Sequence, residues 1–161
     1  TAVAITVNED RDRTGHGDRN SYTKGIVKAL MTNMRNAGTV KADGETLDPS
    51  GKFLLCTIAN GQYIGGKFRC APHADLDDGL MEVCLLDTIS YLRFFRILKT
   101  YTEGRHVDDP KLQDIVHYRR ARKAEVIAPE GFAYSLDGEI IRENHFTVEV
   151  IPKALKFAVP E

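Results

Sequence analysis

Short stretches of β-type residues, separated by turn residues, constrain the fold of this sequence more than any other feature. Apolar and β-branched residues dominate four such stretches, 1–7, 53–59, 80–86 and 115–128. Turn signals recur roughly every eight to twelve positions between them. Many short strands at this spacing are typical of a β-sandwich or an open barrel.

The end of the chain has the most regular alternation. Every second residue is apolar in two runs: Phe146, Val148 and Val150, then Leu155, Phe157 and Val159. This period of two predicts two antiparallel strands, with a turn at Pro152-Lys153.

Two turn signals lie close together in the first third of the chain. Asp43-Gly44 lies inside residues 40–47 and predicts a short hairpin arm there. The tetrapeptide Asp48-Pro49-Ser50-Gly51 predicts a second turn, just before the strand at 53–59.

Only two segments show a helical period. The first has Tyr22, Ile26, Ala29, Leu30 and Met34 on one face. The second follows the capping residue Ser90, has Gly104 beyond its end, and aligns Phe94, Ile97, Leu98 and Tyr101. Strands therefore outnumber helices about four to one. We expect one mainly-β domain over residues 1–161, a β-sandwich or open barrel of antiparallel strands with about two appended helices.

Composition narrows the functional classes. Hydrophobic residues make up 42% and charged residues 28% of the 161 residues, as in an ordinary folded domain. The 22 basic and 23 acidic residues give a net charge of −1, which argues against a nucleic-acid partner. The longest apolar runs have about seven residues, too few to span a membrane. The chain begins with Thr1, as a processed chain or a fragment would.

The three cysteines give no sign of a disulfide framework or a zinc site. Their number is odd and no C-x-x-C occurs, so we expect Cys56, Cys70 and Cys84 to be core thiols in a reducing compartment.

The sequence Asp137-Gly138-Glu139 has two interpretations. Asp-Gly is a common hairpin dipeptide, so the motif is explained by a turn between two strands. Alternatively, a carboxylate displayed on a rigid hairpin suits a general base. Spacing alone favours the turn.

Residues 75–80 carry three carboxylates, Asp75, Asp77 and Asp78, before Gly79-Leu80. They form either a solvated turn or a site for a hard cation, held by carboxylates, backbone carbonyls and water. The segment lacks the length and the closing glutamate of an EF-hand loop.

Two further segments are less specific. Residues 60–66 contain three glycines but match neither a Walker A loop nor G-x-G-x-x-G. The basic run at 119–123 is a solvated strand face or a contact for phosphate or anionic lipid.

Several of these features occur in a particular order. They are Asn60-x-x-Tyr63-x-Gly65-Gly66, Pro72-x-Ala74-x-x-x-Asp78-Gly79-Leu80, Leu136-Asp137-Gly138-Glu139 and the ending Ala154-Leu155-x-Phe157-x-Val159-Pro160. Taken together, the chain resembles the C-terminal half of the bacterial diacylglycerol kinase-like lipid kinases, which are relatives of sphingosine and ceramide kinases.

The resemblance implies a two-domain kinase. An N-terminal domain would bind ATP through a Gly-Gly-Asp-Gly-Thr loop, and a C-terminal β-sandwich would close the cleft. This chain contains no such loop. We therefore expect it to be the second domain without the first, inactive by itself, with the N-terminal domain and a lipid as partners. Contact with the membrane would be peripheral and transient, from the cytoplasm.

The resemblance also implies roles for individual residues. Glu139 would be the proton acceptor from the lipid hydroxyl, and Asp137 would orient Glu139 or reach Mg²⁺. Asp78 would hold an accessory Mg²⁺ with the backbone carbonyls of Asp75 and Leu80. Asn60, Tyr63 and Gly65 would line the interdomain cleft.

Two other readings remain. The chain could be a non-catalytic β-sandwich that binds a lipid or a partner, having lost its kinase half; the NAD kinases, which share the architecture, are a weaker match. If the chain is half of a kinase, the surface on which the N-terminal domain docks is apolar and exposed, and the isolated chain should self-associate, for example as a homodimer. A polar or covered surface at that place favours the non-catalytic binding module.

Overall fold

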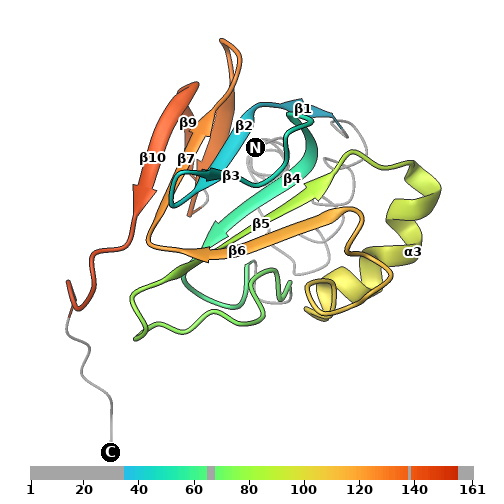
Figure 1. Ribbon diagram of the computed structural model, residues 1–161, viewed down its shortest axis with the longest axis horizontal. Coiled ribbons are helices and arrows are strands. Elements are labelled where there is room, and N and C mark those ends of the chain that lie inside the picture. Colours follow the sequence, from blue (N-terminus) through green and yellow to red (C-terminus); the bar gives the residue numbers. More distant parts are fainter. Residues whose placement is uncertain (1–34, 65–67, 138, 156–161) are drawn as a thin grey trace, which may run out of the picture.

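The computed structural model describes residues 35–64, 68–137 and 139–155. A four-stranded antiparallel sheet, here the first sheet, forms its centre (Figure 1). The strand order in this sheet is β1 (Asn36–Ala37), β4 (Lys52–Ala59), β5 (Met81–Asp87) and β6 (Val116–Ala121).

A second antiparallel sheet of four strands packs against the first. Its order is β10 (His145–Glu149), β7 (Lys123–Ile127), β2 (Thr39–Ala42) and β3 (Glu45–Thr46). β8 (Ala133–Leu136) and β9 (Glu139–Arg142) pair only with each other, as a separate two-stranded ribbon.

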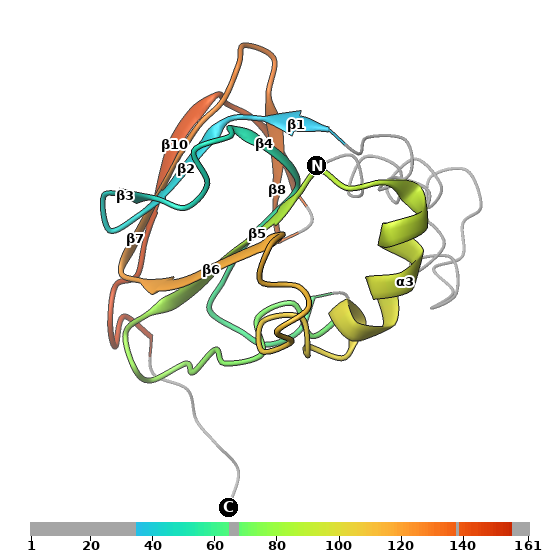
Figure 2. The same ribbon diagram turned by 45° about the vertical axis from the view of Figure 1, so that its right-hand side comes forward.

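The alternation of β5 explains how the layers form. Met81, Val83 and Leu85 point to one face and pack with Val40 and other residues between the two sheets. Cys84 and Leu86 point to the other face, where the helix α3 (Tyr91–Thr102) covers them. Figure 2 shows α3 on one side of β5 and β6 and the second sheet on the other.

The helix confirms the predicted capping. The Ser90 side chain accepts a hydrogen bond from the backbone N–H of Arg93. Phe94, Ile97 and Tyr101 are buried on the predicted face. Beyond the helix, Gly104 has φ +76°, a conformation that glycine adopts easily.

The chain passes from the first sheet to the second at Arg122, between β6 and β7. The Asp43 carboxylate accepts hydrogen bonds from the backbone N–H groups of Arg122 and Lys123. The stretch predicted to be extended at 115–128 is therefore interrupted only at Arg122, where Asp43 stabilises a sharp corner.

The mainly-β prediction is confirmed, with three antiparallel sheets and one helix among the described residues. The Asp43-Gly44 hairpin is confirmed by the pairing of β2 with β3, and Cys70 and Cys84 are buried free thiols. The predicted strand at 1–7 and helix at 22–34 lie outside the described residues. So does most of the last predicted strand, whose Leu155 is exposed and not in a strand. In the part of the chain that is described, no helix has the length and hydropathy needed to cross a membrane.

Candidate functional site

The Asp-Gly-Glu motif lies at the tip of the β8–β9 ribbon. Leu136 pairs with Glu139 across the turn, and Asp137 takes the left-handed conformation with φ +47°. Aspartate tolerates this conformation better than most residues. The sequence therefore forms the hairpin that its composition favours, and the first residue of β9 is a glutamate.

The two carboxylates of this motif are exposed. Behind them, the Tyr134 ring stacks on Phe146 of β10, with ring centroids 3.9 Å apart and planes 19° from parallel. This contact attaches the ribbon to the second sheet. An exposed carboxylate on a hairpin suits proton transfer to or from a bound molecule.

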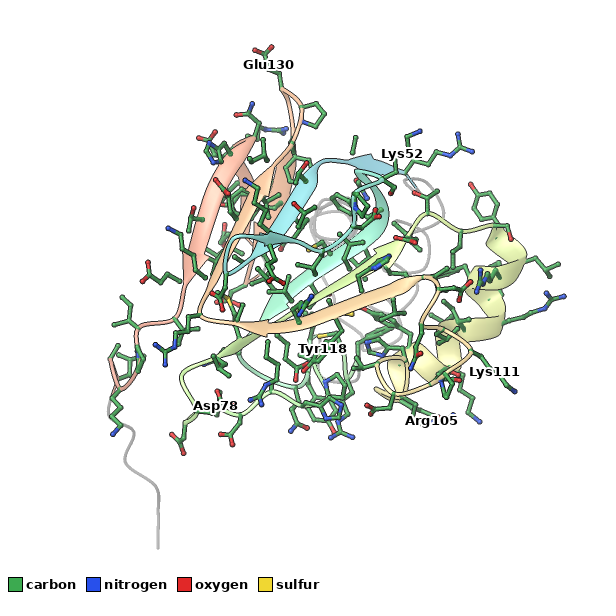
Figure 3. The ribbon with its side chains drawn as sticks, viewed as in Figure 1. Lys52, Asp78, Arg105, Lys111, Tyr118 and Glu130 are labelled. Carbon is green, nitrogen blue, oxygen red and sulfur yellow. The ribbon has the colours of Figure 1, made fainter. Side chains whose placement is uncertain are left out.

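Residues 75–80 form the loop that leads into β5, and Figure 3 shows Asp78 in it. Asp75 accepts a hydrogen bond from the N–H of Asp77 at 2.9 Å, and Asp78 accepts one from the N–H of Leu80 at 2.8 Å. The second oxygen of Asp78 forms an ion pair with Arg120 of β6. A Cβ at Gly79 would lie 3.3 Å from Pro152, so the loop is held against the turn after β10.

This loop offers oxygen donors, as Mg²⁺ requires. Each carboxylate oxygen of Asp78 already has one partner, Leu80 or Arg120, yet a carboxylate can accept about four bonds. The donor set therefore fits a hard cation at Asp78, in competition with the Arg120 guanidinium.

The other predicted residues lie in the segment after β4, where Gln62 donates a hydrogen bond to the carbonyl of Ala74 at 3.2 Å. Asn60 and Tyr63 are exposed after β4, and Gly65 lies outside the described residues. Among the described residues, no hydrogen bond or ion pair joins the Asp-Gly-Glu hairpin to the loop at 75–80. In the described part of the chain, the two predicted sites are therefore not linked by a direct polar contact.

A buried polar cluster escaped the sequence reasoning. Glu82 of β5 is 1% exposed, and neither of its carboxylate oxygens has a hydrogen-bond partner in the described part of the chain. Burial raises the pKa of Glu82, although the neighbouring Tyr118 and His73 oppose the shift. Burial likewise raises the pKa of Tyr118. The signal in the sequence was a single glutamate inside the apolar run at 80–86.

His106 is the second buried group of this kind. Its ring is 1% exposed and lies 4.2 Å from the Tyr101 ring, between centroids. Burial lowers the pKa of His106 to about 4, so the ring is neutral at physiological pH.

An open cavity of about 370 Å³ lies beside this region. It is lined by residues of two segments, Arg69, Pro72, His73, Gly104, Arg105, Asp108, Asp109 and Pro110. Its charged side chains are already engaged: His73 contacts Asp108 at 3.0 Å, and Arg105 pairs with Glu103. In Figure 3, Tyr118 points from β6 toward the loops on the side where Arg105 lies.

Comparisons with known proteins agree on one family. A "Probable lipid kinase YegS-like" of Enterobacter sp. (strain 638) is 29% identical over 136 residues, which cover 84% of this chain and 43% of that protein. A protein of the same name from Shewanella frigidimarina (strain NCIMB 400) is 30% identical over 159 residues, covering 98% of this chain and 48% of that protein. This chain spans about half the length of these curated relatives.

Solved structures show the same fold. A diacylglycerol kinase from Bacillus anthracis str. Sterne superposes with a TM-score of 0.54 over 81% of this chain and 48% of that chain, at 19% identity. A second structure from that organism gives a TM-score of 0.61 over 91% of this chain and 46% of that chain, at 17% identity.

The family model described as "YegS C-terminal NAD kinase beta sandwich-like domain" matches residues 2–159. Because this match covers nearly the whole chain, the chain belongs to that family, the lipid kinase-like C-terminal domains of the YegS and diacylglycerol kinase type.

Proposed function

We propose that this chain is the C-terminal half of an ATP-dependent lipid kinase and that Glu139 is its general base. The observation that carries the proposal is the position of Glu139, exposed at the start of β9 and directly after the hairpin turn. The family match and the relatives named probable lipid kinases support the reaction class. The substrate would be a lipid with a free hydroxyl, such as diacylglycerol.

The reaction transfers one phosphoryl group. The lipid hydroxyl oxygen attacks the γ-phosphorus of ATP and forms the new P–O bond. The bond from the γ-phosphorus to the β–γ bridging oxygen breaks, and ADP leaves with that electron pair. Glu139 takes the proton of the hydroxyl. Catalysis of this type depends mostly on positioning, to which a proton acceptor adds roughly 10²–10⁴-fold.

Asp137 is the second carboxylate of the hairpin. Its left-handed backbone places it in the turn itself, two residues before Glu139. In this proposal it orients Glu139 or reaches a Mg²⁺ ion. Mg²⁺ would neutralise charge on the transferring phosphate oxygens.

Asp78 would hold an accessory Mg²⁺ with the backbone carbonyls of Asp75 and Leu80. The oxygen donors of the loop support this assignment, and the ion would compete with the Arg120 guanidinium for the Asp78 carboxylate. This ion would be structural or regulatory and would be separate from the ion bound with ATP.

The proposal requires a domain that binds ATP. Tyr63 and Ile64 are large apolar side chains exposed at 59% and 41%, next to Asn60 after β4. Exposed apolar groups of this kind suit a contact with that domain, which would belong to the same protein. The same proposal places the lipid at the cleft between the domains, with peripheral contact to a membrane.

The test compares a glutamate of the ribbon with one just beyond it, in the full natural protein that carries this sequence. Glu139→Gln removes the proton acceptor, and Glu143→Gln changes a nearby exposed glutamate that lies after β9. We expect Glu139→Gln to lower lipid phosphorylation by roughly 10²–10⁴-fold and Glu143→Gln to leave it close to wild type. Circular dichroism checks that both variants are folded. Unchanged turnover of folded Glu139→Gln would refute the role of Glu139.

A further inference from the structure

Three potential metal ligands from distant parts of the sequence meet at one edge of the sandwich. They are Asp48 in the loop after β3, Asp87 at the end of β5 and His117 near the start of β6. One ligand atom of each residue lies within 4.8 Å of those of the other two. None of the three belongs to the Asp-Gly-Glu hairpin or to the loop at 75–80.

The backbone fixes this meeting point. His117 pairs with Leu85 of β5, so its side chain points to the face between the two sheets, as that of Leu85 does. Asp87 lies two residues after Leu85 on β5 and therefore points to the same face. The N–H of Asp87 donates to the carbonyl of Ile115 at 2.9 Å. Asp87 also pairs with Phe53 of β4, the strand that the loop carrying Asp48 enters.

Burial and charge make this group unlike a surface cluster. Asp48 is only 8% exposed, and the side chains of Asp87 and His117 are 25% and 27% exposed. The only ion-pair partner found for either carboxylate among the described residues is His117, whose Nε2 lies 3.0 Å from Asp87 Oδ1. Ser50 donates to Asp48 but brings no positive charge. Two carboxylates are thus held close together, and no lysine or arginine of the described residues forms an ion pair with them.

We propose that Asp48, Asp87 and His117 bind a divalent transition-metal ion such as Zn²⁺. An imidazole with two carboxylates is a donor set that Zn²⁺ accepts, whereas Mg²⁺ and Ca²⁺ prefer oxygen ligands alone. Ligands about 2.0–2.2 Å from one ion lie roughly 3–4 Å from each other, compatible with the spacing of these three. The ion would tie the loop after β3 to β5 and β6 and close this edge of the sandwich.

The test measures Zn²⁺ binding to metal-free protein by isothermal titration calorimetry, using the full natural protein. We expect one site that depends on His117 and Asp87. His117→Gln and Asp87→Asn should each weaken its affinity at least tenfold. Excess Mg²⁺ should not displace the ion.

The chain offers a matched control. His145 also contacts a carboxylate, Glu125, at 2.9 Å, and the two form no three-ligand group among the described residues. His145→Gln should therefore bind Zn²⁺ with unchanged affinity. Failure of wild-type protein to bind Zn²⁺ would overturn the proposal, and so would a Zn²⁺ affinity that His117→Gln leaves intact.

A measurement on the wild-type protein covers the case in which a variant does not fold. The nitrogen chemical shifts of the His117 ring, read by NMR, should change when Zn²⁺ is added, while those of His145 should not. A site whose binding leaves the His117 nitrogens unchanged would refute the assignment. Neither measurement depends on kinase activity, so the metal site and the catalytic role of Glu139 can fail independently.

Discussion

The buried imidazole of His106 makes the stability of this domain sensitive to mild acid. The side chain is 1% exposed, neither ring nitrogen has a hydrogen-bond partner among the described residues, and the ring packs against Tyr101. Its pKa is lowered from 6.5 to about 4, mainly by burial. Protonation of His106 in the folded state would place a cation where water cannot reach it.

The sign of the effect follows from the lowered pKa. Well above pH 6.5 His106 is neutral in both the folded and the unfolded state and carries no penalty. As the pH falls from about 6.5 to about 4, the unfolded chain binds a proton that the folded protein does not, and the free energy of unfolding decreases. A pKa difference of this size, at 1.36 kcal/mol for each unit, amounts to a loss of about 3 kcal/mol.

The perturbation that isolates this contribution is His106→Gln, because glutamine does not titrate. Urea unfolding at neutral pH and near pH 4 gives the acid-induced loss of stability for each protein. We expect His106→Gln to lose about 3 kcal/mol less than wild type between these two conditions, whatever its stability at neutral pH. Groups that titrate elsewhere, such as Glu82, cancel in this comparison.

The control is His145→Gln, which removes an exposed histidine that contacts Glu125. Its acid-induced loss should stay closer to that of wild type than the loss of His106→Gln does. If wild type and His106→Gln lose the same free energy on acidification, His106 is solvated in the folded protein and the reasoning fails.

Two further perturbations test contacts near the candidate sites. Gly104→Ala should lower the free energy of unfolding in urea by about 2 kcal/mol or more, because φ is +76° and an added Cβ would lie 2.8 Å from Arg69 Cδ. The control Gly131→Ala, at φ +79° with nothing within 4 Å of the added Cβ, should cost about 1 kcal/mol. Equal losses for the two variants would contradict this reasoning. Arg120→Gln should strengthen Mg²⁺ binding at Asp78 severalfold in a calorimetric titration, because it removes the guanidinium that forms an ion pair with the Asp78 carboxylate. Unchanged or weaker Mg²⁺ binding would show that Arg120 does not compete with the ion.

Local sequence signals predicted those parts of the fold that depend on neighbouring residues. Asp43-Gly44 and Asp137-Gly138 indicated turns, and hairpins form at both places. Ser90 and the spacing of Phe94, Ile97 and Tyr101 indicated α3 because capping and a buried face are properties of one continuous segment.

Contacts between distant residues could not be predicted in this way. β2 pairs with β7, more than eighty residues later, and nothing in either strand specifies the other. The burial of Glu82 depends on its neighbours across the sheet, and so does the approach of His117 to Asp48. For the same reason, the ion pair of Arg120 with Asp78 was not expected from a run of basic residues.

For the candidate site, too, the sequence indicated some properties and not others. The order of the motifs indicated the family, which the comparisons confirm. The roles of Glu139, Asp137 and Asp78 stay predictions, because they depend on how a lipid, ATP and an ATP-binding domain meet the exposed hairpin.

The most direct test of the central claim is product analysis after incubation of the full natural protein with ATP, Mg²⁺ and diacylglycerol in mixed micelles. If the domain is half of a lipid kinase, the γ-phosphate of ATP should appear on the lipid hydroxyl, and Glu139→Gln should abolish most of that product. Transfer of the phosphate to NAD, or no transfer to any lipid hydroxyl by folded protein, would contradict the account.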